Sequence, residues 1–383
     1  MALHFTEDEL AGRRARAIEA MAAAGLDGLL MFRQESMYYL TGYDTFGYVF
    51  FQCLYLGADG RMMLLTRLPD LRQAHHTSVV EDVRVWVDLP DANPAEQLRS
   101  ILDAFGCAGR RLGVEYEAYG LTARNGRMLD AAFDGFARLS DASELVSRLR
   151  VVKSAAEIGY VRKAAELADA ALGEANRLAV AGAFEGDILA AMHGAIFAGG
   201  GDYPGNEFII GSGNDALLCR YFSGRRRLDA DDQITLEFAG AYRHYHACLM
   251  RTIRIGAPGD RQRAMHAAAV DALHAVEETL RPGVTFGAGF DAHARVLDDA
   301  GFREHRMNAC GYSLGTTFSP NWMDWPMLYH GNPVAAAPGM VIFVHIIVFD
   351  SARGLAMAPG RTLLVTETGT EVLSTASVDL VVN

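Results

Sequence analysis

The chain has 383 residues, half of them hydrophobic, which is enough to build two globular domains rather than one ordinary core. Its formal net charge of -12 at pH 7 argues against a nucleic-acid-binding surface. The five cysteines are scattered and form no C-x-x-C pair, and the sequence begins without a signal-peptide pattern. No apolar run reaches membrane-spanning length. These features favour a cytoplasmic protein with reduced thiols and no membrane partner.

The first 150 residues alternate helical and strand-like segments. Apolar spacing predicts a helix over 7–24 that stops at Gly25, and the apolar run 26–32 is typical of a buried strand. Further strands are expected at 53–56, 62–66, 83–87 and 111–114. This alternation predicts an α/β domain over residues 1–150.

The pattern changes near residue 150. Ser154 and Glu157 have the S-x-x-E spacing of a capping box, which predicts the start of a long helix that runs to about 180. A shorter helix near 185–198 and a second long helix over about 261–281 follow, separated by strand hairpins. Residues 151–383 are therefore expected to form a second domain, of the α+β class.

The segment 237–252 is the most unusual part of the second domain. An apolar strand ends in a carboxylate, Glu237, and the small residues Ala239 and Gly240 predict the turn of a strand hairpin. The segment resembles the signature hairpin of the pita-bread family, which includes methionine aminopeptidase, aminopeptidase P, prolidase and creatinase. In that family the hairpin carries two Asp metal ligands eleven residues apart, and the matching positions here are Glu237 and Cys248.

The three remaining metal positions of the family also match local patterns in this chain. They are Tyr312 within a Gly-x-x-x-Gly segment expected to be a turn, His345 after a Pro-Gly-Met strand, and Gly360 before Arg361. A pair of hard cations needs several carboxylate oxygens, and this set retains one carboxylate. The substitutions predict a pocket without a metal cofactor, while Cys248 and His345 remain an alternative pair of ligands for a single zinc ion.

The resemblance implies a pita-bread catalytic domain of the α+β class, preceded by a smaller α/β domain of the creatinase type. It also implies a homodimer, because in the family an N-terminal loop reaches the partner subunit's site. The matching loop is the aromatic segment 38–48, in which Tyr43 and Phe46 are expected to contact substrate.

Glu237 is the expected centre of the chemistry. Burial of a carboxylate without a metal raises its pKa toward neutrality, which suits a general acid or base, and a carboxylate can also act as a nucleophile. A surface salt bridge at the end of a strand is the alternative. His246 and His345 are candidate proton carriers, because histidine titrates nearest to neutral pH. Since strand residues alternate, His244 and His246 are expected on one face.

Candidate substrate-binding residues lie both before and after Glu237 in the sequence. Arg220 stands where aminopeptidase P-like chains carry a His, and since arginine does not lose its proton it is expected to clamp a substrate carboxylate or to form a structural ion pair. Aromatic faces near an acid suit a small cation, although core packing is the alternative. The residues of this second group are Tyr312, Trp322, Asp324 and Trp325.

Within the family, the ectoine hydrolase branch resembles this chain in both domains. The matching stretches are Glu237-x-Ala239-Gly240-x-Tyr242-x-x-Tyr245-His246, Gly311-Tyr312-x-x-Gly315 with Pro320-x-Trp322, and the N-terminal loop 40–44 with Gln52-Cys53. The resemblance implies a metal-independent hydrolase, without a cofactor, that opens a C–N bond in a small cyclic amidine, guanidine or amide. Two alternatives remain. One is a metal-dependent enzyme, either an Xaa-Pro peptidase or a dimethylsulfoniopropionate lyase-like protein, and the other is a non-catalytic binder of small molecules.

Overall fold

The computed structural model describes residues 3–220 and 224–383. They form two compact units, the first ending at Arg150 and the second beginning at Val151. Across the described ranges, no helix has the length and apolar character that crossing a membrane requires.

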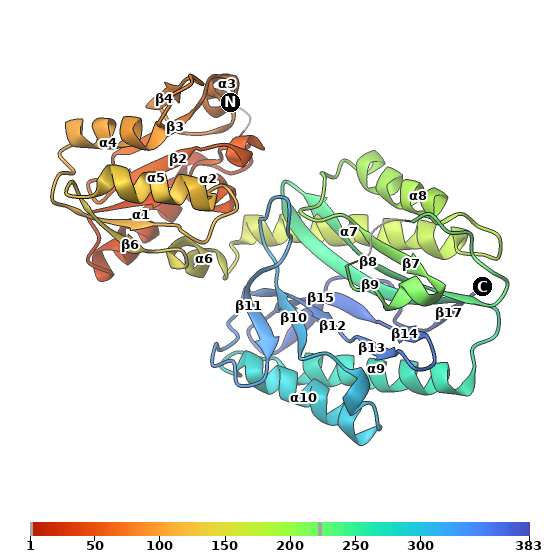
Figure 1. Cartoon of the computed structure of the whole chain (residues 1–383). Helices are drawn as coiled ribbons and strands as arrows, with labels where there is room; N and C mark the ends of the chain where they lie inside the picture. Colours follow the sequence, from red (N-terminus) through yellow and green to blue (C-terminus); the bar gives the residue numbers. More distant parts are fainter. Residues whose placement is uncertain (1–2, 221–223) are drawn as a thin grey trace. The chain divides into compact units, whose positions relative to one another are not determined.

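The first unit is built on a six-stranded sheet with the order β4-β3-β2-β1-β5-β6. The predicted strands are confirmed, and the structure adds the strand β6 to the sheet and several helices to the unit (Figure 1). The strands are β1 Gly28–Met31, β2 Cys53–Gly57, β3 Met62–Arg67, β4 Val83–Trp86, β5 Arg111–Val114 and β6 Arg138–Asp141. The helices are α1 Glu7–Ala23, α2 Gln34–Thr41, α3 Leu68–Thr77, α4 Pro94–Ala104, α5 Ala123–Phe133 and α6 Leu145–Arg150.

The aromatic segment 38–48 is not a continuous loop, because its first four residues belong to α2. A buried carboxylate explains where this helix begins. Glu115 Oε2 accepts hydrogen bonds from the backbone N–H groups of Phe32 and Arg33, at 3.0 and 2.9 Å, just before α2. It thereby satisfies the N–H of the N-cap residue Arg33 and fixes the chain directly before the first helical turn. Gly42, with φ of 83°, ends the helix.

The second unit is built on a nine-stranded sheet. Seven of its strands follow the order β11-β10-β12-β15-β9-β8-β7, and the other two are β16, which pairs with β15, and β17, which pairs with β9. Its strands are β7 Ile209–Ser212, β8 Asp232–Tyr242, β9 Tyr245–Ile255, β10 Ala309–Ser313, β11 Asp324–Tyr329, β12 Val341–His345, β15 Gly360–Val365, β16 Thr370–Val372 and β17 Val381–Val382. The strands β13 Val348–Asp350 and β14 Leu355–Met357 form a separate small hairpin. The predicted turn at Gly311–Gly315 is wrong, since most of it lies in β10.

The helices of the second unit are α7 Ala155–Leu178, α8 Glu185–Ala198, α9 Asp260–Thr279 and α10 Phe286–Asp299. The capping box is confirmed, because Ser154 Oγ accepts from the Glu157 N–H at 3.3 Å and Glu157 Oε2 accepts from the Ser154 N–H at 2.8 Å. Helix α10 was not predicted from the sequence. Its glycines lower helix propensity, yet Gly287 is required there because a Cβ would lie 2.8 Å from the Asn332 backbone nitrogen.

The small residues of the signature hairpin do not form its turn. Strand β8 continues through Ala239 and Gly240, and the turn is made by Arg243 and His244, whose φ angles are 50° and 64°. Gly240 instead permits close packing, since a Cβ at that position would lie 1.9 Å from the carbonyl oxygen of Ala164 in α7. Because His244 lies in the turn, the expectation of a strand pair with His246 on one face is wrong.

The helices cover one face of this sheet. In Figure 1, α7 and α8 lie beside β8 and β9, whereas α9 and α10 lie along the half of the sheet that contains β10, β12 and β15. Ile342, Val344 and Leu363 belong to the core cluster formed with α9 and α10. Since side chains alternate along a strand, Phe343 and His345 point to the face that these helices do not cover.

Candidate active site

One row of residues crosses four neighbouring strands of the second unit. Glu237 in β8 lies opposite Met250 in β9, Met250 lies opposite Gly360 in β15, and Gly360 lies opposite His345 in β12. Directly opposed residues of antiparallel strands share a face of the sheet. This register therefore places Glu237 and His345 on one face, with the side-chain-free position Gly360 between them.

The two other family metal positions lie on the same face. Cys248 is two residues from Met250 in β9, and Tyr312 lies opposite Phe343, two residues before His345. Thr362 joins β9 to β15 here, because its Oγ1 accepts from the Cys248 N–H at 2.8 Å and donates to the Cys248 carbonyl at 2.9 Å. All five positions identified by local pattern are thus gathered on one surface.

Glu237 is held by a directed chain of hydrogen bonds. Trp322 Nε1 donates to Tyr312 Oη at 2.8 Å, and Tyr312 Oη donates to Glu237 Oε1 at 3.0 Å. An indole nitrogen can only donate, so the Tyr312 oxygen accepts there and its own proton points to the carboxylate. Within the described residues, Glu237 Oε2 has no hydrogen-bond partner, which leaves this oxygen for a substrate or a water molecule.

Burial sets the protonation of this carboxylate. Glu237 is 9% exposed, and desolvation raises its pKa to about 7, while the hydrogen bond from Tyr312 and the charge of Arg220 act in the opposite direction. A carboxyl group with this pKa exists in both protonation states at neutral pH. It is able to accept a proton in one step of a reaction and to return it in the next.

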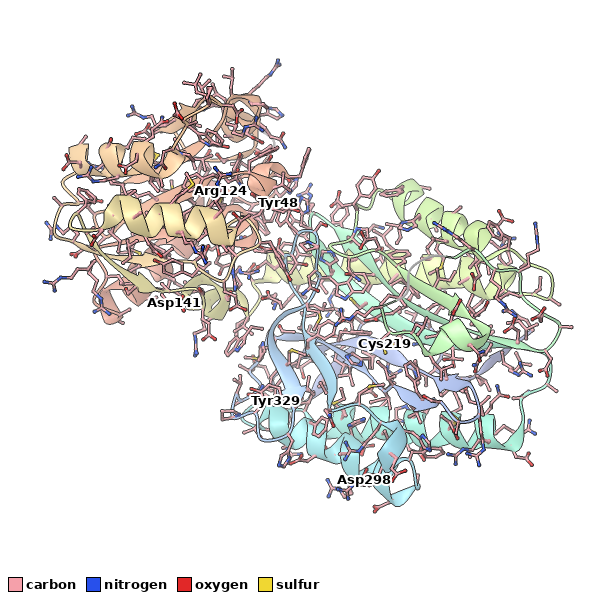
Figure 2. All side chains as sticks on the ribbon, viewed as in Figure 1. Tyr48, Arg124, Asp141, Cys219, Asp298 and Tyr329 are labelled. Carbon is pink, nitrogen blue, oxygen red and sulfur yellow. The ribbon has the colours of Figure 1, made fainter. Side chains whose placement is uncertain are left out.

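The neighbouring acidic groups stay protonated. Burial and the charge of Glu237 raise the pKa of the Cys248 thiol and of the Tyr312 phenol well above their usual values. Cys219, labelled in Figure 2, lies close enough to Glu237 for the carboxylate to raise its pKa in addition to the effect of burial. The site therefore has one carboxylate that titrates near neutrality, surrounded by neutral donors.

His345 lies beside this chain of hydrogen bonds. Its ring centroid is 5.5 Å from that of Tyr312, and its Nδ1 is buried with no hydrogen-bond partner among the described residues. Burial, followed by the charges of His293 and Arg220, lowers the pKa of His345 to about 4. At neutral pH this imidazole is uncharged and offers a lone pair to a proton or to a polar substrate group.

His246 is placed differently. It lies opposite Ala241, four residues along β8 from Glu237, which separates the two backbones by roughly 13 Å at the usual strand rise. Its Nε2 accepts from the Gly205 N–H at 2.8 Å, and its Nδ1 lies 3.1 Å from Thr317 Oγ1. Both nitrogens of this fully buried ring are therefore occupied, and the structure does not bring His246 to the carboxylate.

The candidate substrate-binding residues of the second unit fall into separate environments. Arg220 is exposed and acts electrostatically on Glu237 and His345, so its charge lies near the open side of the site. Trp325 packs against the core cluster of α9 and α10. Asp324 lies beside Lys153, since Asp324 Oδ2 and Lys153 Nζ are 3.4 and 3.5 Å from a Cβ built at Gly315. Trp322, by contrast, donates a hydrogen bond to Tyr312 Oη.

Tyr43 and Phe46 belong to the first unit. Tyr43 is 1% exposed, and its hydroxyl group donates to Gln52 Oε1 at 3.3 Å, so it contributes to the core of that unit. Phe46 is 76% exposed. Of the two residues, Phe46 is the one whose side chain is available for an external contact.

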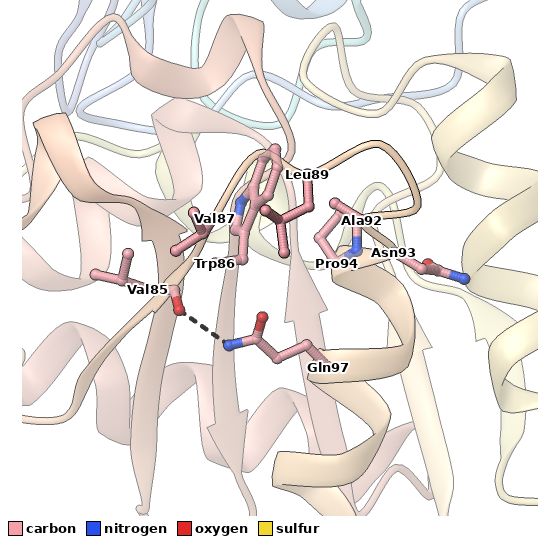
Figure 3. A pocket seen from close by; sticks show the side chains of 8 residues that line it. All are labelled: Val85, Trp86, Val87, Leu89, Ala92, Asn93, Pro94 and Gln97. Atoms are coloured by element: carbon pink, nitrogen blue, oxygen red, sulfur yellow. Dashed lines mark hydrogen bonds between the residues drawn. The ribbon is translucent and has the colours of Figure 1, made fainter.

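A cavity of about 240 Å³ opens in the first unit, beside β4 and the start of α4 (Figure 3). Gln97 Nε2 donates to the Val85 carbonyl at 3.0 Å across it. Its lining side chains are apolar or amide groups, namely Val85, Trp86, Val87, Leu89, Ala92, Asn93, Pro94 and Gln97. The lining offers no group that titrates near neutrality, so the chemistry is expected in the second unit.

Some residues of the site were not identified from the sequence. Phe343 and Thr362 take part only through the strand register, and Gly205 and Thr317 come from connecting segments with no motif of their own. For Cys219, the sequence offered one indication that it belongs to the site, namely its position directly before Arg220. Contacts that depend on pairing between distant strands carry no local sequence pattern.

The donor set does not fit a pair of metal ions. On the shared face it contains one carboxylate, one phenol, one thiol and one imidazole, and the phenol and the thiol are held protonated. Within residues 3–220 and 224–383, no group of three or more His, Cys, Asp and Glu side chains is arranged to hold a metal ion. Hard divalent cations require more oxygen ligands than this arrangement offers.

Comparison with known proteins agrees with this architecture. Residues 159–367 match the model of metallopeptidase family M24, and residues 13–152 match the creatinase/prolidase N-terminal domain. The chain is 26% identical to ectoine hydrolase of Halomonas elongata over 98% of this chain and 97% of that one, and 25% identical to the Xaa-Pro dipeptidase of Pyrococcus furiosus over 60% and 65%.

A solved structure is similar over the whole chain. Dipeptidase PepE from Mycobacterium ulcerans superimposes with a TM-score of 0.85 at 26% identity, covering 99% of both chains. Together with the family models, this similarity confirms the pita-bread domain and the creatinase-type domain expected from the sequence. The chain therefore belongs to metallopeptidase family M24 and is a hydrolase of that family.

Proposed function

We propose that this protein hydrolyses a C–N bond in a small cyclic amidine, guanidine or amide without a metal ion, with Glu237 as the reacting carboxylate. The observation that carries the proposal is the buried carboxylate Glu237 on the site face, whose pKa is raised to about 7. The similarity to ectoine hydrolase over nearly the full length of both chains supports the same class of substrate.

As a general base, Glu237 takes a proton from a water molecule while the water oxygen bonds to the electrophilic carbon of the substrate. The resulting tetrahedral carbon then loses its bond to nitrogen, and protonated Glu237 returns the proton to the leaving nitrogen. An amidine treated in this way yields an amide and an amine, so one water molecule is consumed. In the nucleophilic variant, Glu237 bonds to the carbon, the C–N bond breaks and the leaving nitrogen takes up a proton; one water molecule then cleaves the bond between Glu237 and the carbon and regenerates the carboxylate.

The other site residues support either route. The hydrogen bond from Tyr312 fixes Oε1 of Glu237, which leaves Oε2 to react with water or with the substrate. His345 is uncharged at neutral pH and is suited to accept a hydrogen bond from a protonated amidine nitrogen. Arg220, at the open side, would bind a carboxylate group of the substrate. The proposed substrate therefore carries a cationic and an anionic end.

We further propose that the enzyme is a cytoplasmic homodimer. All five cysteines are unpaired, which suits a reducing compartment. The exposed Phe46 in the first unit is the residue we expect at the contact between subunits. Sedimentation of the wild type and of Phe46→Asp tests this, and a wild-type monomer at micromolar concentration would contradict it.

A substrate screen tests the reaction. The purified protein is incubated with ectoine, creatine and an Xaa-Pro dipeptide, with and without a chelator, and its metal content is measured. We expect turnover of an amidine or guanidine that survives the chelator and is lost in Glu237→Gln, without stoichiometric metal. Cleavage of the dipeptide that depends on metal would instead establish a metallopeptidase. Binding without turnover, unchanged in Glu237→Gln, would establish a non-catalytic binder.

A further inference from the structure

We propose that His246 is a positioning residue that fixes two backbone segments, 202–206 and 314–322, and through them holds Trp322 over Tyr312. The importance of this arrangement for catalysis rests on the function proposed above. The arrangement itself is a property of the folded protein and can be tested without a substrate. It assigns to His246 a role different from that of a proton carrier.

The two contacts of His246 define its tautomer. A backbone N–H can only donate, so Nε2, which lies 2.8 Å from the Gly205 nitrogen, must be unprotonated. The proton of the neutral ring is then on Nδ1, where it is donated to Thr317 Oγ1 at 3.1 Å. Burial lowers the pKa of His246 to about 4, which keeps this tautomer uncharged at neutral pH.

The segment bonded to Nε2 packs directly on the backbone of Trp322. A Cβ built at Gly205 would lie 2.9 Å from the carbonyl oxygen of Asn321 and 3.3 Å from the Trp322 nitrogen. The Gly205 backbone therefore supports the peptide group that precedes Trp322. A displacement of Gly205 would remove this support.

The segment that contains Thr317 is tied to the start of β9. The His246 N–H donates to the Gly315 carbonyl at 3.3 Å, and the Thr317 N–H donates to the His244 carbonyl at 3.1 Å. The ring of His244 stacks on Phe318 at 4.2 Å between centroids. Residues 315–318 are thus held by the hairpin turn, and the side chain of His246 adds the bond to the Thr317 hydroxyl group.

These contacts lead in a short path to the reacting carboxylate. His246 holds Gly205 and Thr317, the two segments hold Trp322, and Trp322 donates to Tyr312, which donates to Glu237. Replacing His246 with an apolar side chain would leave the buried Gly205 N–H without an acceptor, and such a loss is costly enough to move a loop. The expected result is a displaced Trp322 and a weaker hydrogen bond to Glu237.

Fluorine NMR of protein labelled with 5-fluorotryptophan tests the proposal. The chain has three tryptophans, and Trp322→Phe identifies the signal of interest. In the wild type this signal should titrate with a midpoint near the pKa of Glu237, about 7, and the titration should be absent in Glu237→Gln. In His246→Leu we expect the Trp322 signal to shift and to lose most of its titration, while the other two signals stay in place.

Two further variants separate positioning from general stability. His246→Gln keeps one acceptor and one donor, so it should restore the titration in large part. His293→Leu removes an equally buried histidine of α10 and should leave the Trp322 signal unchanged. If His246→Leu does not fold, Thr317→Val removes one partner only and is expected to shift the Trp322 signal alone.

An unchanged, titrating Trp322 signal in folded His246→Leu, or in Thr317→Val where the former does not fold, overturns the proposal. The failure of the proposed reaction would be seen differently, as absence of hydrolysis by the wild type in the substrate screen. The two results are independent, because the NMR experiment needs no turnover.

Discussion

The raised pKa of Glu237 makes a prediction about stability. A carboxyl group that ionises near its ordinary 4.5 in the unfolded chain and near 7 in the folded protein binds more protons in the folded state between these values. Unfolding releases that proton, so stability contributed by this group falls as pH rises from 4.5 to 7 and is constant above. Replacing Glu237 with Gln, which keeps the shape and cannot ionise, should remove this pH dependence.

The magnitude follows from the shift. About 2.5 pKa units correspond to roughly 3 kcal/mol at about 1.4 kcal/mol per unit. We therefore expect Glu237→Gln to gain up to about 3 kcal/mol relative to the wild type at pH 8, and little of that gain to be present at pH 5. The expected change is a gain in stability, although Glu237 is the residue proposed to be catalytic.

The assay is denaturant unfolding of the wild type and the variant at pH 5, 6, 7 and 8. Fluorescence of Trp322 and Trp325 in a Trp86→Phe background reports on the second unit, because Trp86 is the tryptophan of the first. Glu278→Gln, an exposed position of α9, is the matched control and should leave the pH dependence as it is. A difference between wild type and Glu237→Gln that is equal at pH 5 and pH 8 would refute a buried, proton-binding carboxylate.

Three other predictions follow from the same geometry. Tyr312→Phe removes the hydrogen bond that lowers the pKa of Glu237, so the acidic limb of kcat/KM for a substrate found in the screen should move to higher pH, and an unmoved limb would contradict the hydrogen-bonded pair. Gly240→Ala forces a methyl group against the Ala164 carbonyl and should cost about 3 kcal/mol in chemical unfolding. Gly194→Ala, at an exposed position in α8 with open space around it, should instead gain about 0.5–1 kcal/mol, and equal effects of the two changes would contradict the packing. Dialysis against a chelator should leave both the unfolding curve and the turnover unchanged, whereas a loss restored by a divalent metal would show that the donor set does bind one.

Local sequence patterns predicted much of the fold. The capping box at Ser154 and Glu157 involves residues three apart, so it is visible in the sequence before any tertiary contact forms. Helix α10 was missed because its glycines oppose a helix in isolation, and the close approach of the Asn332 segment, which requires Gly287, is a tertiary feature. The hairpin turn was misplaced for a similar reason. Gly240 is a glycine that permits close packing against α7, and the turn residues Arg243 and His244 are not the Asn-Gly or Asp-Gly pair that signals such a hairpin turn in a sequence.

The sequence by itself determined which chemical groups stand at the five family positions, and hence that a dimetal site lacks its carboxylates. It also singled out Glu237 as the candidate reacting carboxylate, because that position follows from a local strand pattern and a resemblance of neighbouring residues. Tertiary structure decided how these groups are arranged and hydrogen-bonded. The proton of Tyr312 points to Glu237 because Trp322, ten residues further along, donates to the same oxygen.

The protonation states of Glu237 and His246 were also decided by the tertiary structure. The pKa of Glu237 depends on burial produced by several strands at once, and the tautomer of His246 depends on a backbone donor that lies 41 residues away. Sequence patterns report which residues are near one another along the chain and which face of an element they share. Desolvation and hydrogen-bond direction arise only when distant segments pack, so they required the folded structure.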